Sequence, residues 1–163
     1  MDVVIEFEGY QLKNGFCFKE LCVFFVKEDF WVHFFIKSQG EFKYLSKADK
    51  RSVKFCEKYL HKLFWRAGHI EQGYLMTCVK NLIEPNATIF TKGESKVNIL
   101  KNELKNIAVK NVENIFSKEA MKSAAFATTS CPLRFHRGVK HCAVHKARRL
   151  AEAILGTYTS ESK

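Results

Sequence analysis

Cysteine and histidine residues gather in one short stretch near the end of the chain, from Cys131 to His145. Cys131 and His136 lie in a segment with a proline and a glycine that is predicted to be a loop, whereas Cys142 and His145 begin a segment with helical spacing. Thiolates and imidazoles at these intervals are typical of a tetrahedral zinc site. Spacing alone therefore favours one zinc ion held by these four residues. The alternative is a set of buried thiols with surface histidines beside a basic helix.

The same stretch is strongly basic. Six lysine and arginine residues lie between positions 134 and 149, with no acidic residue among them. They are Arg134, Arg137 and Lys140 in the loop and Lys146, Arg148 and Arg149 on the helix. The whole chain carries a formal charge of +10, which favours a polyanionic partner. We expect this surface to contact the backbone of RNA or another nucleic acid. The alternative is a solvated positive face that keeps the protein soluble.

Length and composition indicate one globular domain. The chain has 163 residues, of which 47% are hydrophobic, enough to build a single core. We expect one domain over residues 1–156 and a polar tail over 157–163. Residues 1–10 are acidic and alternating, unlike a signal peptide, and no apolar run is long enough for a membrane span. Most cysteines sit inside apolar runs, which predicts reduced thiols and an intracellular location, cytoplasmic or nuclear, without a membrane partner.

The pattern of apolar residues predicts the elements that position these groups. Alternation predicts strands at 2–10, 16–26 and 30–36, joined by tight turns into an antiparallel meander. Ser46 is expected to cap a long helix that ends near Trp65. Its apolar side is expected to hold Val53, Cys56, Tyr59, Leu60, Leu63 and Phe64. A helix at 72–82, a strand at 87–91, a helix from Gly93, a strand at 107–112 and a final helix at 141–156 follow.

This order of elements is that of an α/β fold of the RNase H-like class. Such a fold has a mixed sheet, with three antiparallel strands followed by parallel-type strands, and helices that flank it. In this chain we expect the zinc site to staple the C-terminal helix to the rest of the domain.

Two motifs resemble those of DEDDh-type 3′–5′ exonucleases. Glu6-Phe-Glu8-Gly resembles the Asp-x-Glu-Gly of the first strand, which places two carboxylates on one face to hold magnesium. The segment His141-Cys-Ala-Val-His-Lys-Ala-Arg is similar to the last motif, in which the histidine is the general base. An active enzyme would use Glu6, Glu8 and His141.

The chain departs from the other half of that pattern. The middle aspartate is expected within residues 91–96, where Glu94 is the only carboxylate and is out of register. The last aspartate falls at His145 or Lys146. Two-metal phosphodiester chemistry needs about four carboxylates to hold two ions about 4 Å apart. We therefore expect no exonuclease activity.

A further resemblance, over roughly residues 3–155, is to the Maelstrom domain of the germline small-RNA pathway. That domain looks like an RNase H-like fold that lost its exonuclease carboxylates and gained a structural zinc site. The resemblance implies Glu20, Cys131, His136 and Cys142 as zinc ligands, with Glu20 in place of His145. It also implies RNA binding in a small-RNA or mobile-element context. A protein–protein adaptor is the remaining alternative.

Overall fold

The computed structural model describes residues 1–117 and 141–160. Five predicted site residues lie outside this range: Cys131, Arg134, His136, Arg137 and Lys140. For residues 117–127 the sequence pattern fits either a helix or a loop, and only Ser117 of that segment lies within the described residues.

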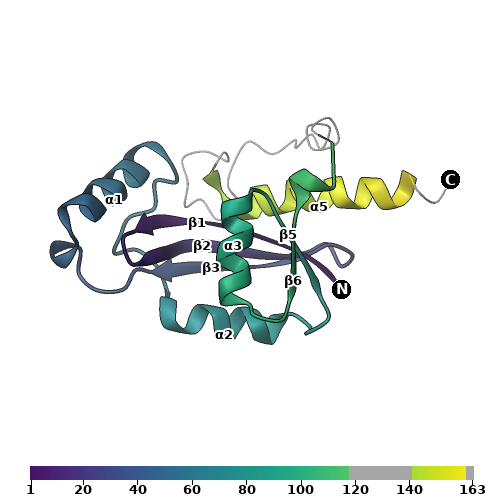
Figure 1. Cartoon of the computed structure of the whole chain (residues 1–163), viewed down its shortest axis with the longest axis horizontal. Coiled ribbons are helices and arrows are strands. Elements are labelled where there is room, and N and C mark those ends of the chain that lie inside the picture. The colour runs from purple at the N-terminus through teal and green to yellow at the C-terminus, as the bar shows by residue number, and fades with distance from the viewer. Residues whose placement is uncertain (118–140, 161–163) are drawn as a thin grey trace.

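The described chain forms one six-stranded sheet with helices on both faces (Figure 1). The strands are β1 (Asp2–Leu12), β2 (Gly15–Phe25), β3 (Phe30–Lys37), β4 (Ile70–Glu71), β5 (Thr88–Thr91) and β6 (Ala108–Asn111). The helices are α1 (Lys47–Tyr59), α2 (Gln72–Leu82), α3 (Glu94–Glu103) and α5 (Ala143–Ser160), with 3₁₀ turns η1 (Phe42–Tyr44) and η2 (Val112–Asn114). The strand order is β4-β3-β2-β1-β5-β6.

The sheet is mixed, as the sequence predicts. β1, β2 and β3 are antiparallel neighbours. β5 runs parallel to β1, and β6 runs parallel to β5. The sequence did not predict β4, a short strand that pairs in parallel with β3.

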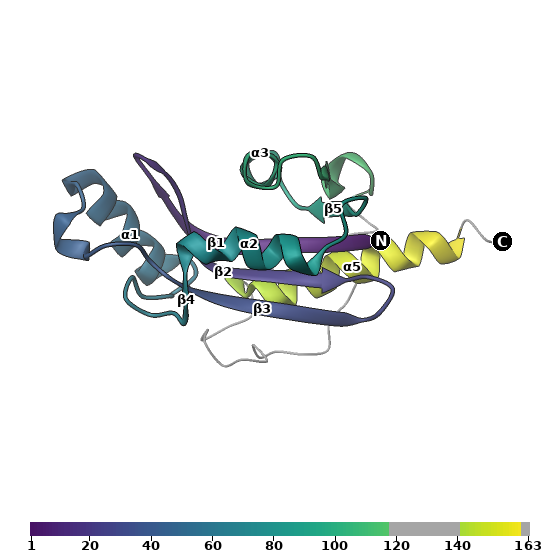
Figure 2. The same ribbon diagram turned by 90° about the horizontal axis from the view of Figure 1, so that it is seen from below.

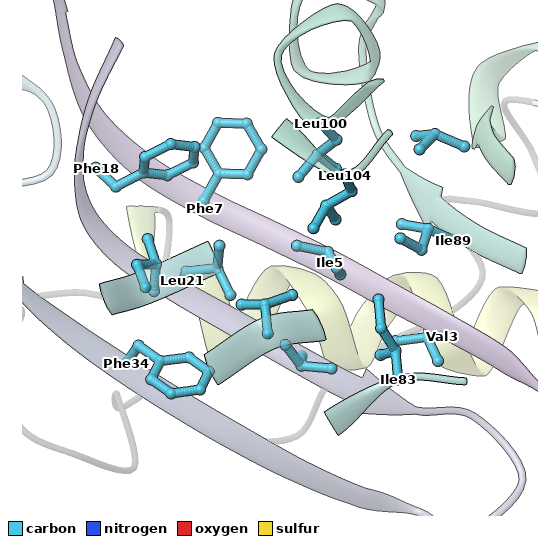
Figure 3. Packing of buried hydrophobic residues seen from close by; sticks show 14 of the residues in the cluster. Val3, Ile5, Phe7, Phe18, Leu21, Phe34, Ile83, Ile89, Leu100 and Leu104 are labelled. Carbon is cyan, nitrogen blue, oxygen red and sulfur yellow. The ribbon is translucent and has the colours of Figure 1, made fainter. Parts of the chain in front are cut away.

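One face of the sheet is an apolar core. Side chains from β1 and β2 such as Ile5, Phe7 and Leu21 meet Leu100 of α3 and Leu75 of α2 there (Figure 3). All five are essentially inaccessible to solvent. Figure 2 shows that α5 covers the opposite face from α2. α5 packs there through a second cluster that includes Val4, Phe24 and Ala147.

The strand register places polar residues on the face under α5. Glu6 pairs with Cys22 across β1 and β2, and Glu8 pairs with Glu20. Because side chains alternate along a strand, these four residues point to the face that Val4 and Phe24 also occupy. The expectation that Glu6 and Glu8 share one face is therefore confirmed.

A β-bulge interrupts this register just beyond Glu8. Glu8 pairs with Glu20, but Gly9 pairs with Phe18, so Lys19 is an additional residue in β2. The bulge reverses the alternation, because Phe18 packs into the core under α2 and α3 whereas Glu20 points toward α5. Gly9 is needed here, since a Cβ atom would lie 2.1 Å from the carbonyl oxygen of Cys17.

Lys19 is fully buried at this bulge. Its ammonium donates to the carbonyl oxygens of Ile36 (2.8 Å), Trp65 (3.1 Å) and Ala67. These three hydrogen bonds use the donors of the buried ammonium group. They also link the segment after α1 to β2 and β3.

The first helix is shorter than predicted. α1 ends at Tyr59, not near Trp65, and the chain then alternates between buried and exposed residues from His61 to Arg66. Glu57 accepts a hydrogen bond from the Trp65 amide (2.6 Å), and the Leu63 carbonyl accepts one from Tyr10. These tertiary bonds replace those that a longer helix would have made, and Tyr59 is exposed as a result.

The last helix is displaced toward the C-terminus. α5 begins at Ala143 and continues to Ser160, so part of the predicted polar tail is helical. In the described part of the chain, no helix is long and apolar enough to cross a membrane.

Candidate functional site

A cavity of about 700 Å³ lies between β1, the start of α3 and the first turns of α5. Its lining residues come from five parts of the chain: Glu6, Lys92, Gly93, Lys96, Glu113, His141, His145, Lys146, Arg149 and Leu150. The first-strand glutamate and the histidine of the last motif thus meet in one cavity, as the exonuclease resemblance implies. Four lysine and arginine side chains and two carboxylates line it.

Glu6 has a full set of partners. Its side chain is 1% exposed. One carboxylate oxygen accepts hydrogen bonds from the Thr91 hydroxyl (3.2 Å) and the Lys92 amide (2.9 Å). The other oxygen forms an ion pair with Lys96 on α3. Every contact comes from the end of β5 or the start of α3.

Glu8 also pairs with a lysine. Its carboxylate contacts the ammonium of Lys146, which lies on α5 and lines the cavity. Lys146 is one of the two positions at which the exonuclease pattern has an aspartate. A cation therefore stands where that pattern requires a metal-binding carboxylate.

Within the described residues, the remaining carboxylates do not complete a metal site. Glu94 accepts a hydrogen bond from the side-chain amide of Asn111 (3.4 Å) and does not line the cavity. Glu113 does line it, with a carboxylate oxygen 4.0 Å from the Lys92 ammonium. Divalent ions of exonuclease type require several carboxylates with oxygens available to the metal. Among residues 1–117 and 141–160, Glu6 and Glu113 are the carboxylates that line this cavity.

Sequence analysis missed the two lysines at the start of α3. Lys92 and Lys96 are four residues apart and flank Gly93, whose φ of 97° fixes the turn into the helix. Residues 91–96 were expected to hold the middle aspartate of the exonuclease pattern. Glu94 was therefore considered as a functional residue there, and the two lysines were not. Two lysines on either side of a glycine at the start of a helix were the sequence signal that could have identified them.

The predicted cations of α5 separate into two groups. Lys146 and Arg149 line the cavity, whereas Arg148 does not. Instead, Nε of Arg148 lies 3.9 Å from Oε1 of Glu152, one turn further along the helix.

Glu20 lies beneath the start of α5. It is fully buried. One carboxylate oxygen accepts a hydrogen bond from the Ala143 amide (3.1 Å), and the other lies 2.9 Å from His33 Nε2. Ala143 follows Cys142 directly, so two of the predicted zinc ligands are brought to the same place. The contact with His33, a residue of β3, had no sequence signal.

His145, the other candidate for the fourth zinc ligand, lines the cavity with Glu6. Burial and the nearby Arg149 and Arg148 lower the pKa of His145 below its usual value. Within residues 1–117 and 141–160, no group of three or more histidine, cysteine, aspartate or glutamate side chains could hold a metal ion. Cys131 and His136 are outside that range.

No protein-family model matches the chain, and no curated protein matches it. Solved structures of the Mopeia virus exonuclease domain are similar. One, fully depleted of manganese, has a TM-score of 0.62 and 14% identity over 95% of this chain and 76% of that one. Another, soaked with alendronate, has a TM-score of 0.57 and 16% identity over 95% of this chain and 78% of that one. This chain therefore has the RNase H-like exonuclease fold.

Proposed function

We propose that this domain binds RNA in the cavity between β1, α3 and α5 and does not hydrolyse it by two-metal chemistry. One observation carries the proposal. The two carboxylates of the first-strand motif are each paired with a lysine, Glu6 with Lys96 and Glu8 with Lys146.

These ion pairs change the chemistry that the cavity supports. A divalent ion at Glu6 would have to displace the Lys96 ammonium and two hydrogen bonds from the chain. In the part of the chain that the structure describes, the cavity lining lacks the two further carboxylates that would hold metals in an exonuclease. Fixed ammonium groups stabilise a bound phosphate but do not activate water, so they suit binding without cleavage.

The cavity is suited to a phosphate backbone. Lys92, Lys96, Lys146 and Arg149 outnumber the carboxylates among its lining residues. His145, with its lowered pKa, is neutral at pH 7 and able to donate or accept a hydrogen bond. The volume of about 700 Å³ is within the range of small-ligand sites and accommodates a nucleotide. The likeness to exonuclease domains supports nucleic acid as the ligand.

The test measures binding and cleavage separately. Fluorescence anisotropy with single-stranded RNA, in buffer without added magnesium or manganese and without chelator, should show salt-dependent binding. Arg149→Gln should lower the slope of log affinity against log salt by about 0.7, the value for one phosphate contact on a single strand. Arg148→Gln is the matched control, because it removes a neighbouring cation that does not line the cavity.

End-labelled RNA incubated with magnesium or manganese should stay intact. Stepwise shortening that is lost in Glu6→Gln, Glu8→Gln and His141→Ala variants would instead establish the nuclease alternative. RNA binding that is absent at every salt concentration would favour the protein–protein adaptor.

We also propose that Glu20, Cys131, His136 and Cys142 hold a structural zinc ion. The support is the buried Glu20 carboxylate, which contacts the amide next to Cys142. His33 would orient that carboxylate, as outer hydrogen-bond partners do in zinc sites. The bound ion would supply a fixed anchor between β2 and α5.

Elemental analysis of protein purified without added metal should find one zinc per chain. Cys142→Ser and Glu20→Gln should lower the zinc content and the melting temperature, and His145→Ala should leave the zinc content unchanged. Fully folded protein with well under half an equivalent of zinc contradicts the proposal. Zinc loss in His145→Ala but not in Glu20→Gln would make His145 the fourth ligand.

A further inference from the structure

The outer face of α1 combines aromatic rings with cations. Phe55 and Tyr59 are 54% and 57% exposed, with ring centroids 5.3 Å apart. Arg51, Lys54 and Lys58 are exposed on the same helix. At 100° per residue, these five residues occupy about 140° of the helix circumference, opposite the buried Val53 and Cys56. We call these five residues the α1 platform.

The charge of the α1 platform is not balanced nearby. Between residues 41 and 66 the chain has eight lysine or arginine residues and three acidic ones. Each acid is engaged elsewhere: Glu41 with Lys43, Asp49 with the Lys13 amide, and Glu57 with the Trp65 amide. In the described part of the chain, no ion pair is formed by the three cations of the platform.

The two rings form one continuous apolar patch. They lie at i and i+4 on the helix and contact each other at an interplanar angle of 46°. Lys58 lies over the Tyr59 ring, with its ammonium 4.9 Å from the ring centroid. Exposed aromatic surface beside unpaired cations suits a ligand that has flat apolar faces and a negative backbone. Single-stranded nucleic acid has both.

We propose that the α1 platform binds single-stranded nucleic acid, with bases stacked on Phe55 and Tyr59 and phosphates held by Arg51, Lys54 and Lys58. This site shares no residue with the cavity between β1, α3 and α5. Figures 1 and 2 place α1 at the end of the sheet opposite the N-terminus. The proposal stands whether or not the cavity binds RNA.

The test separates stacking from charge. Binding of the whole chain to a labelled oligouridine of about 12 nucleotides is compared with binding to an abasic oligomer of the same length. A Phe55→Ala, Tyr59→Ala double variant should bind oligouridine about 25-fold more weakly or worse, because stacking of one base on one ring contributes at least about 5-fold and two rings are removed. Its affinity for the abasic oligomer and its salt slope should not change.

Tyr74→Ala is the matched control. Tyr74 is 68% exposed but lies on α2, away from the platform, so its removal should affect neither oligomer. Phe55→Trp should retain the binding that Phe55→Ala loses. Lys54→Gln with Lys58→Gln should lower the salt slope for both oligomers by about 0.7 per lost contact.

Oligouridine affinity that is unchanged in the double ring variant overturns the proposal and leaves the platform as a surface for a protein. Equal losses for both oligomers also overturn it, because stacking requires bases. Repeating the series in an Arg149→Gln background distinguishes the two sites. The ring effect should persist at the same magnitude there, even if Arg149→Gln itself shows that the cavity binds no RNA.

Discussion

The face of the sheet under α2 and α3 and the face under α5 are built from alternate residues of the same strands. Ile5 and Phe7 of β1 point into an apolar core, whereas Glu6 and Glu8 point toward α5. Both faces are largely closed to water, so the carboxylates under α5 need partners that the first face does not require. Lys96, Lys146 and the amide of Ala143 are among those partners.

The difference shows where this fold can vary its chemistry. The core under α2 and α3 is stabilised by buried apolar area and complementary packing. Apolar residues of similar size can therefore replace one another there. The face under α5 depends on specific pairs, such as Glu6 with Lys96 and Glu8 with Lys146.

Phe7→Ala should lower the free energy of unfolding by about 3–5 kcal/mol, since it removes a ring from the centre of the apolar core. Urea denaturation followed by circular dichroism measures the change. Tyr74→Ala, an exposed aromatic site, should change stability by less than about 0.5 kcal/mol. A loss below about 1 kcal/mol for Phe7→Ala would mean that the two faces do not differ in this way.

Lys19→Met should destabilise the domain by about 2 kcal/mol at pH 7, because three buried carbonyl groups lose a charged donor. The difference from wild type should grow as pH rises. Burial lowers the pKa of Lys19 from 10.5 to about 8. Between these values the unfolded chain holds a proton that the folded chain has released, so Lys19 makes the wild type more stable with rising pH.

Denaturation of both proteins between pH 7 and pH 10 measures this trend. Both proteins carry a Cys17→Ala change, because Lys19 lowers the pKa of the Cys17 thiol and its titration would otherwise differ between them. Lys80→Met, at an exposed lysine of α2, should show a flat difference. A flat difference for Lys19→Met would show that burial does not shift its pKa.

The pair of Glu8 and Lys146 should contribute least, at about 1 kcal/mol or below. Both side chains keep some contact with solvent, which screens the pair. A double-mutant cycle with Glu8→Gln and Lys146→Gln measures the coupling, and added salt should reduce it. The exposed pair of Glu41 and Lys43 is the control and should show no measurable coupling. A coupling energy of several kcal/mol would show that the face under α5 depends on this one pair as strongly as the apolar core depends on Phe7.

Sequence periodicity was sufficient for most of the fold. Alternating and helical patterns predicted the three antiparallel strands, the two later parallel strands and the helices between them. It failed after Tyr59, where Leu60, Leu63 and Phe64 fit helical spacing. Alternation of period two from His61 to Arg66 fits equally well, and bonds from Glu57 and Tyr10 selected it.

The sequence also indicated which residues meet at the site. The two-residue spacing of Glu6 and Glu8 predicted that both lie on one face of β1. The motif that begins at His141 predicted that the start of the last helix lies near the first strand. The sequence also predicts that the exonuclease carboxylates are incomplete, and this stays a prediction. These features depend on local spacing, which any chain with this pattern of strands and helices would share.

Only the tertiary structure decided how the charges are paired. Lys96 is 90 residues from Glu6, and Lys146 is 138 residues from Glu8. Their ion pairs exist because folding brings the first turns of α3 and α5 to the polar side chains of β1. The bulge at Lys19 likewise separates Phe18 from Glu20, which a regular strand would place on one face. Long-range packing sets such pairings, because the contacts that fix them lie far apart in the chain and leave no local pattern.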